Sequence, residues 1–158
     1  MWRLSTCVTT GSAGPSQLRQ DAVYLLAWRG NRVVGRLTWL FRSRYPKVRS
    51  MLADVAEMNA LEARPQGQGI GTALILAGEQ EARRRAVPIL GLAVEVQNHG
   101  ARRLYERLGY SLWEHGLVID RWTQSDDQGN IVREHADECF YLTKPPANDH
   151  RRRALACR

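Results

Sequence analysis

Cysteine is scarce in this sequence of 158 residues, and the few thiols are far apart. They are Cys7, Cys139 and Cys157, with no Cys-x-x-Cys pair and no histidine at metal-ligand spacing. A disulfide framework needs paired cysteines at regular spacings, and a structural zinc site needs clustered thiol or imidazole ligands. The sequence therefore predicts neither, and we expect no bound metal.

Long apolar runs are also missing. No stretch approaches the roughly 20 apolar residues that a membrane-spanning helix needs, and Met1–Thr6 is not followed by the apolar core of a secretory signal. The composition, 44% hydrophobic and 25% charged, lies in the ordinary globular range. We therefore expect a soluble, cytoplasmic protein with a single domain over residues 1–145.

The net charge of +7 is unevenly distributed. Five basic residues and one acidic residue lie between Lys144 and Arg158, so this segment carries +4 of the total. Short basic ends of this kind are usually solvated, and residues 146–158 are predicted to be a disordered tail. We expect no specific binding of nucleic acid. A small basic nucleic-acid-binding module stays the less favoured alternative, with one faint hint in the basic and aromatic residues at 42–47.

The order of predicted elements indicates a mixed α/β or α+β domain. Apolar runs at 23–28 and 33–40 favour two antiparallel strands, because the Gly-Asn pair between them is typical of a hairpin turn. A polar loop is expected at 42–49, a strand at 52–63 and a helix at 70–85. A strand at 89–96, a helix capped by Asn98 and ending at Gly109, and strands at 110–122 and 139–143 follow. Residues 9–20 are expected to be irregular, with a short helix opening at Pro15 or Ser16.

Three glycines stand at alternate positions in Gln66–Thr72, between a predicted strand and a predicted helix. Backbone amides in such a turn can point into one concavity, and the helix dipole favours negative charge there, so an anion site is predicted. A dinucleotide site needs Gly-x-Gly-x-x-Gly and a nucleoside-triphosphate loop needs Gly-Lys-Ser/Thr; the segment has neither. A glycine turn that only lets the strand and helix pack is the structural alternative.

Two segments together resemble a known family. Gln66, Gly69 and Gly71 match the Gln/Arg-x-x-Gly-x-Gly/Ala signature of the GNAT superfamily of N-acetyltransferases. The segment from Asn98 to Tyr110 is similar to that superfamily's Asn-x-x-Ala-x-x-x-Tyr-x-x-x-Gly-Phe segment, with tyrosine in place of the last phenylalanine. The resemblance covers residues 53–110. It implies a mixed, mostly antiparallel sheet, splayed between its fourth and fifth strands and flanked by helices, with acetyl-CoA in the cleft.

The resemblance also implies roles in acetyl transfer to a primary amine of a small molecule or protein, by direct attack in a ternary complex. Tyr105 matches the general acid that protonates the departing thiolate. The structural alternative is that Tyr105 is only an aromatic residue of the core. Glu57 lies where some members carry a general base, and Asp54 and Glu95 are the alternatives. The implied cofactor-binding residues are the backbone of Leu61, Glu62 and Ala63, the loop residues Gln66, Gly67, Gln68, Gly69, Ile70, Gly71 and Thr72, and Asn98 and Tyr105, with Arg64 a weaker candidate.

The predicted N-terminal region is abbreviated, since the family usually places a strand and two helices there and few residues precede Val23. One wall of the acceptor site is therefore expected to be short. Acceptor recognition is expected to depend on the loop at 42–49, the segment 125–134, the basic tail, or a second subunit of a homodimer. A degenerate member that holds CoA without catalysis is the other function left open.

Overall fold

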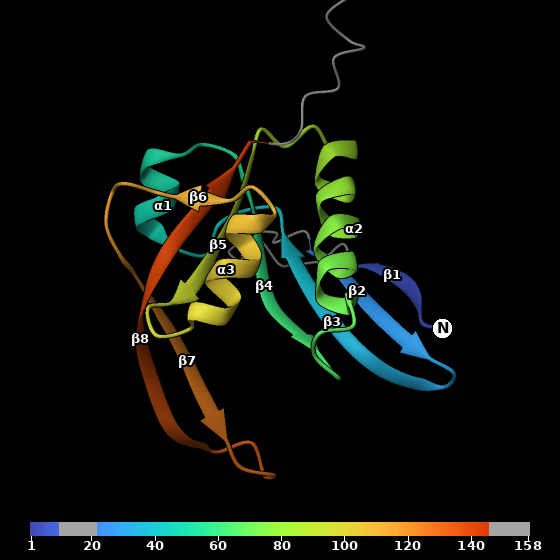
Figure 1. The fold of residues 1–158 in the computed structure, drawn as a ribbon. Coiled ribbons are helices and arrows are strands. Elements are labelled where there is room, and N and C mark those ends of the chain that lie inside the picture. Colours follow the sequence, from blue (N-terminus) through green and yellow to red (C-terminus); the bar gives the residue numbers. More distant parts are fainter. Residues whose placement is uncertain (10–21, 146–158) are drawn as a thin grey trace, which may run out of the picture.

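The structure, a computed structural model, describes residues 1–9 and 22–145, which form a curled eight-stranded sheet with three helices (Figure 1). The strands follow the order β1-β2-β3-β4-β5-β8-β6, and β7 pairs with β8. Every pair is antiparallel except β4 with β5. The mixed, mostly antiparallel sheet is thus confirmed. The predicted tail at 146–158 and the short helix expected at Pro15 or Ser16 lie outside the described residues.

The N-terminal part of the sheet is built from three antiparallel strands. The predicted hairpin is confirmed as β2 (Ala22–Arg29) and β3 (Arg32–Leu40). β1 (Arg3–Thr9), which pairs with β2, is not among the predicted strands. Its apolar residues are few, and it becomes a strand because β2 offers it an edge, with Trp2 and Leu4 packing against the core.

The segment predicted as a polar loop at 42–49 contains a helix, which corrects that prediction. α1 (Pro46–Met51) begins with a proline in its first turn, where a missing amide hydrogen costs nothing. Val48 is its buried residue, so no apolar periodicity marks the helix in the sequence. As a result β4 (Val55–Ala63) begins at Val55, later than the predicted residue 52.

β4 and β5 (Ile89–Glu95) lie side by side only over their first halves. Their parallel pairing runs from Val55 opposite Ile89 to Met58 opposite Leu92. Beyond that point β4 follows β3, while β5 follows β8 (Ile131–Lys144). The divergence is the predicted splay. Within the described chain, it leaves the β5-facing backbone edge of β4 without a strand partner from Asn59 onward.

Two further helices flank the sheet, as predicted. α2 (Ile70–Arg84) covers β2, β3 and β4 and buries Ile70, Leu74 and Ile75 in the main core. α3 (His99–Arg107) begins after Asn98 and buries Tyr105. Neither these two helices nor α1, the helices of residues 22–145, combines the length and apolarity that a membrane crossing would require.

A close approach between α2 and β3 makes Gly78 a position with no room for a side chain. A Cβ at Gly78 would lie 1.5 Å from Trp39 Nε1, and the Trp39 side chain is fully buried. We expect Gly78→Ala to lower the free energy of unfolding by about 2 kcal/mol or more, because overpacking exceeds the gain from replacing a helical glycine. Urea unfolding measures the loss.

Gly71 in the first turn of the same helix is the matched control. A Cβ there would meet Ala63 and Leu61 at 3.9 and 4.0 Å, which are ordinary contacts. Gly71→Ala is expected to leave stability unchanged or to raise it by up to about 1 kcal/mol. Equal stability for the two variants would contradict the close packing at Trp39.

The C-terminal strands differ most from the prediction. The strand expected at 110–122 is divided into β6 (Ser111–Leu112) and β7 (Val118–Ser125), and β8 begins at Ile131 rather than at residue 139. Residues 121–134 are exposed on both faces of the hairpin, so burial imposes no apolar alternation on them. This part of the β7–β8 hairpin extends beyond the rest of the sheet (Figure 1).

Candidate active site

A cleft of about 260 Å³ lies where β4 and β5 diverge. Four of the residues singled out from sequence line it: Leu61 of β4, Glu95 of β5, Asn98, and Tyr105 of α3. Two further charged residues line it as well: Arg44, from the loop at 42–49, and Asp120, which was not predicted. The cleft therefore joins the predicted acid and part of the predicted cofactor site to a polar group contributed by the loop before α1 and by β7.

Tyr105 presents a free hydroxyl at this cleft. The side chain is 8% exposed, and no described residue forms a hydrogen bond with its hydroxyl group. The ring packs edge-on against Tyr110 at a centroid distance of 6.2 Å. Burial raises the pKa of Tyr105 to about 12. The phenol therefore holds its proton at neutral pH, which a group that donates a proton must do.

The sequence predicts two roles for Asn98, capping of a helix and contact with the cofactor. The structure shows the first of these, because Asn98 caps α3. Its Oδ1 accepts a hydrogen bond from the Ala101 amide at 3.1 Å, which satisfies one of the free donors at the start of α3. The side chain also lines the cleft. Because the cap uses only Oδ1, the amide nitrogen of Asn98 is available to a ligand in the cleft.

The glycine loop forms an open N-terminus on α2. Gly69, the N-cap residue, is left-handed with φ 74°, and no side chain in the described part of the chain caps the helix. Gln66, Gly67 and Gln68 are exposed, whereas Ile70 is buried in the core and anchors the helix. The first-turn amides of α2 therefore face outward on a helix of 15 residues, an arrangement suited to an anion.

The flanks of this loop are held by two exposed pairs. The side chain of Gln68 accepts a hydrogen bond from Arg29, and Glu62 lies 2.6 Å from Arg36. The Arg36 bond lowers the pKa of Glu62. Both side chains of the second pair are more than half exposed, so its contribution to stability is small. Glu62 and Gln68 thus have side-chain partners on β2 and β3, and the binding predicted for them rests on their backbone groups.

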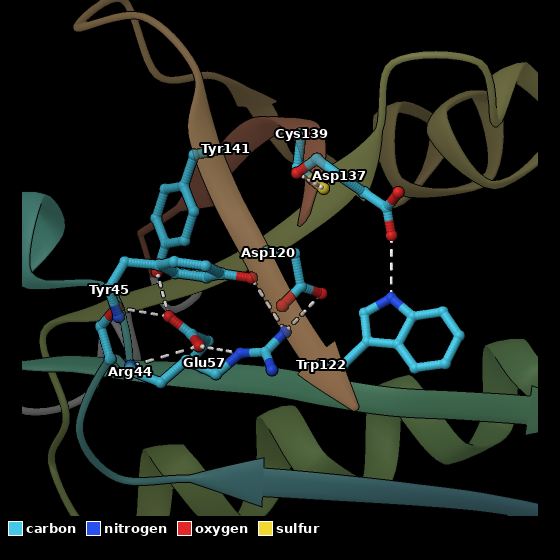
Figure 2. A network of polar contacts seen from close by, with 9 residues as sticks. Arg44, Tyr45, Glu57, Asp120, Trp122, Asp137, Cys139 and Tyr141 are labelled. Carbon is cyan, nitrogen blue, oxygen red and sulfur yellow. Dashed lines mark hydrogen bonds and ion pairs between the residues drawn. The ribbon is translucent and has the colours of Figure 1, made fainter. Parts of the chain in front are cut away.

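Glu57 is the buried centre of a polar network (Figure 2). Its carboxylate accepts hydrogen bonds from the Ser43 hydroxyl, from the Arg44 amide at 3.3 Å and from the Tyr141 hydroxyl at 3.0 Å. Arg44 Nε lies 3.5 Å away. Burial raises the pKa of Glu57, and the hydrogen bonds from Ser43, Arg44 and Tyr141 act against that rise.

The position of Glu57 bears on the predicted general base. The residue is 1% exposed and does not line the cleft. Of the two alternatives, Glu95 is exposed at the end of β5 and does line it. Asp54 is exposed just before β4, at the end of the strand opposite to the divergence. The role of Glu57 as a base stays a prediction.

Arg44 links Glu57 to a second carboxylate, that of Asp120 on β7. The guanidinium of Arg44 donates to Asp120 Oδ2 at 2.7 Å and to the Tyr45 hydroxyl at 2.9 Å (Figure 2). The Arg44 and Asp120 side chains are 29% and 24% exposed. No local sequence signal marks this pair, because the partners are 76 residues apart and meet only when β7 joins β8.

The buried tyrosines predict a loss of stability in alkali. Burial raises the pKa of Tyr45, Tyr105, Tyr110 and Tyr141 above the usual value of about 10. Below about pH 10 these phenols are protonated in both states, so their full contribution is present. At higher pH the unfolded chain releases protons that the folded protein keeps. The contribution is then lost progressively, through a pH of about 12 for Tyr105.

Urea unfolding between about pH 9 and about pH 11 measures this loss. With four shifted groups, the free energy of unfolding is expected to fall by roughly 4 to 5 kcal/mol per pH unit on the steep part of the curve. A free energy that stays constant over this interval would contradict the burial of these hydroxyls.

Known proteins share both the sequence pattern and the fold. The model described as Acetyltransferase (GNAT) family matches residues 9–110. A mycothiol acetyltransferase of Nocardiopsis dassonvillei is 45% identical over 49 residues, which are 31% of this chain and 15% of that protein. The matches to the first curated relatives cover between 15% and 30% of those proteins.

Solved structures agree in fold over most of the chain. The Escherichia coli ribosomal-protein-S18-alanine N-acetyltransferase superposes with a TM-score of 0.60 and 19% identity, over 95% of this chain and 98% of that one. A putative acetyltransferase of Salmonella typhimurium, solved with its cofactor acetyl-CoA, has a TM-score of 0.56 and 17% identity, over 80% of this chain and 66% of that one. With the family model matching more than half of its residues, this chain belongs to the acetyltransferase (GNAT) family.

Proposed function

We propose that this chain is an acetyl-CoA-dependent N-acetyltransferase that moves the acetyl group to a primary amine by direct attack in a ternary complex. The observation that carries the proposal is the cleft between β4 and β5, where Tyr105 presents a protonated hydroxyl that no described residue bonds. Acetyl-CoA, when bound, supplies an activated acetyl thioester. The other steps are assigned to side chains and backbone groups of this chain.

The geometry of β4 and α2 suits an elongated anionic cofactor. The unpaired edge of β4 from Asn59 to Ala63 offers backbone donors and acceptors to an amide-bearing arm, as an added strand would use them. Gly71 is adjacent to this edge, since a Cβ there would touch Leu61 and Ala63. A ligand that follows the edge therefore reaches the open amides from Gly67 to Thr72, where we place the pyrophosphate.

Side chains at the cleft then have distinct roles. Tyr105 donates a proton to the leaving sulfur, because its raised pKa keeps the phenol protonated. The amide nitrogen of Asn98 donates to the cofactor while Oδ1 keeps the helix capped. Backbone amides of β4 near Leu61 orient the thioester carbonyl and stabilise negative charge on its oxygen.

Turnover with a panel of primary amines tests this proposal. Purified protein is mixed with acetyl-CoA and each amine, and release of the CoA thiol is followed, with acetylated product confirmed by mass spectrometry. We expect amine-dependent thiol release above the rate without amine. Binding of acetyl-CoA with no transfer to any small amine or amine-bearing peptide would instead favour the CoA-binding protein without catalysis.

A further inference from the structure

A second cavity adjoins the cofactor cleft. Its volume is about 590 Å³, and it lies between α1 and the segment that leads into β7. Arg44 and Asp120 line both this cavity and the cleft. Their ion pair therefore lies where the two spaces meet, and a molecule in the larger cavity can contact this pair.

One carboxylate oxygen of Asp120 accepts no hydrogen bond from the described residues. Oδ2 is held by Arg44 at 2.7 Å, whereas Oδ1 is buried and has no hydrogen-bond partner among the described residues. A buried carboxylate oxygen without a donor costs free energy, so a turn of the Asp120 side chain that brings Oδ1 to an N–H group of a ligand is favoured. Glu57 offers no such oxygen, because Ser43, Tyr141 and the Arg44 amide already bond its carboxylate.

The walls of the cavity define what can fill it. Tyr45, Pro46, Leu117, Val118 and Ile119 form apolar walls. Besides the Arg44–Asp120 pair, the charged lining residues are Lys47 and Arg121, both basic and exposed. An apolar body suits these walls, one amine suits Asp120, and an anionic group suits the basic rim, whereas a polyamine would meet like charge.

We propose that this cavity holds the acceptor, a primary amine on an apolar body that carries an anionic group, and that the carboxylate of Asp120 is the general base that receives the ammonium proton. The inference rests on the proposed function and deepens it. The amine attacks the thioester carbonyl, the C–N bond forms and the C–S bond breaks. Of the two protons that nitrogen loses, one goes to Asp120 and then to solvent. The second also goes to solvent, Tyr105 protonates the sulfur, and solvent returns a proton to Tyr105.

Three amines test the predicted class of acceptor. Phenethylamine has an apolar body, its para-carboxylate analogue adds an anionic group far from the amine, and spermidine carries several cations. We expect kcat/KM to be highest for the para-carboxylate and at least about tenfold lower for spermidine. Preference for spermidine, or turnover of none of the three by protein that binds acetyl-CoA, would overturn this assignment.

Filling the cavity tests where the acceptor binds. Ile119 and Ile131 lie on paired strands and are 42% and 61% exposed, but only Ile119 lines the cavity. We expect Ile119→Trp to raise KM for the para-carboxylate amine at least about tenfold and to leave the Kd of acetyl-CoA unchanged. Ile131→Trp is the matched control and should behave as wild type. Equal KM values for the two variants would contradict binding of the acceptor in this cavity.

The base is tested by Asp120→Asn, which keeps the size of the side chain. We expect kcat to fall by about 10²-fold or more with the para-carboxylate amine, because loss of a general base costs this much. The loss should shrink to less than about tenfold with an analogue that carries fluorine on the carbon next to the aminomethylene group. Fluorine there makes the amine weakly basic, so the amine is already neutral and needs no base to remove its first proton. An equal loss with both amines would assign Asp120 only a positioning role, and full turnover would exclude it.

Failure of this inference can be told apart from failure of the proposed function. If acetyl-CoA neither binds nor loses its acetyl group in the wild-type protein, the proposed function itself is wrong. If wild-type protein transfers the acetyl group and Asp120→Asn does so equally well, only the base assignment fails. Glu57→Gln, tested in parallel, then shows whether the buried carboxylate is the one that turnover requires.

Discussion

Tyr105→Phe is expected to lower kcat by about 10²- to 10³-fold, because the variant loses the proposed proton donor for the leaving thiolate. The rest of the site should stay intact, since the hydroxyl has no hydrogen-bond partner among the described residues and the ring still fills its place beside Tyr110. The Kd of acetyl-CoA is therefore expected to change by less than about threefold. Steady-state thiol release and calorimetric titration give the two values.

Tyr110→Phe is the matched control, because it removes the hydroxyl of the neighbouring tyrosine. That hydroxyl donates to buried Glu79 at 3.0 Å, and Glu79 also pairs with Lys144 at 2.9 Å. The variant should lose about 1 kcal/mol of stability and keep its turnover. Tyr105→Phe should show the reverse. Full turnover of Tyr105→Phe across the alkaline range would exclude Tyr105 as the acid.

Gly69→Asp is expected to weaken acetyl-CoA binding by about 30-fold or more. Gly69 is left-handed with φ 74°, and nothing lies within 4 Å of the Cβ that a side chain would add. The substitution places a negative charge among the amides where we place the pyrophosphate. Two like charges roughly 4 to 8 Å apart repel by about 2 to 4 kcal/mol at an effective dielectric constant of about 20. Calorimetric titration of acetyl-CoA measures the change in Kd.

Gly69→Asn isolates the charge from the change of shape. Aspartate and asparagine have similar size, and both tolerate the left-handed conformation better than other residues with a side chain. The asparagine variant should bind acetyl-CoA within about fivefold of wild type. The difference between the two variants should decrease as salt is added, because exposed charges are screened. The same Kd for both variants would place the pyrophosphate elsewhere.

The predictable parts of this protein are those that local sequence determines. The hairpin at Gly30 and Asn31, the helix α2 and the α3 cap at Asn98 follow from turn chemistry, helical periodicity and capping, and each is present in the structure. The divergence of β4 from β5, in contrast, is predicted only by the family resemblance. The two short motifs that carry the resemblance also predict the cofactor loop at 66–71 and Tyr105 as the acid, and these two roles stay predictions.

The missed parts depend on contacts between distant segments. α1 has one buried residue, Val48, and the outer part of the β7–β8 hairpin has none, so neither carries a periodic pattern. Asp120 lies on β7 and meets Arg44 only after the sheet has assembled. The sequence marks Glu57 as a candidate general base, but its burial beside Tyr141 depends on the packing of β8.

Acetyl-CoA is proposed to bind the folded chain along β4 and the N-terminus of α2. Thermal unfolding with increasing acetyl-CoA tests it most directly, because a ligand that binds only the folded state raises the melting temperature. At about 100 times Kd the gain is about 2.7 kcal/mol, which corresponds to roughly 5 to 11 °C for a chain of this size. We expect this rise for wild-type protein and a smaller one for Gly69→Asp at the same concentrations. A melting temperature that stays constant up to millimolar acetyl-CoA would contradict it.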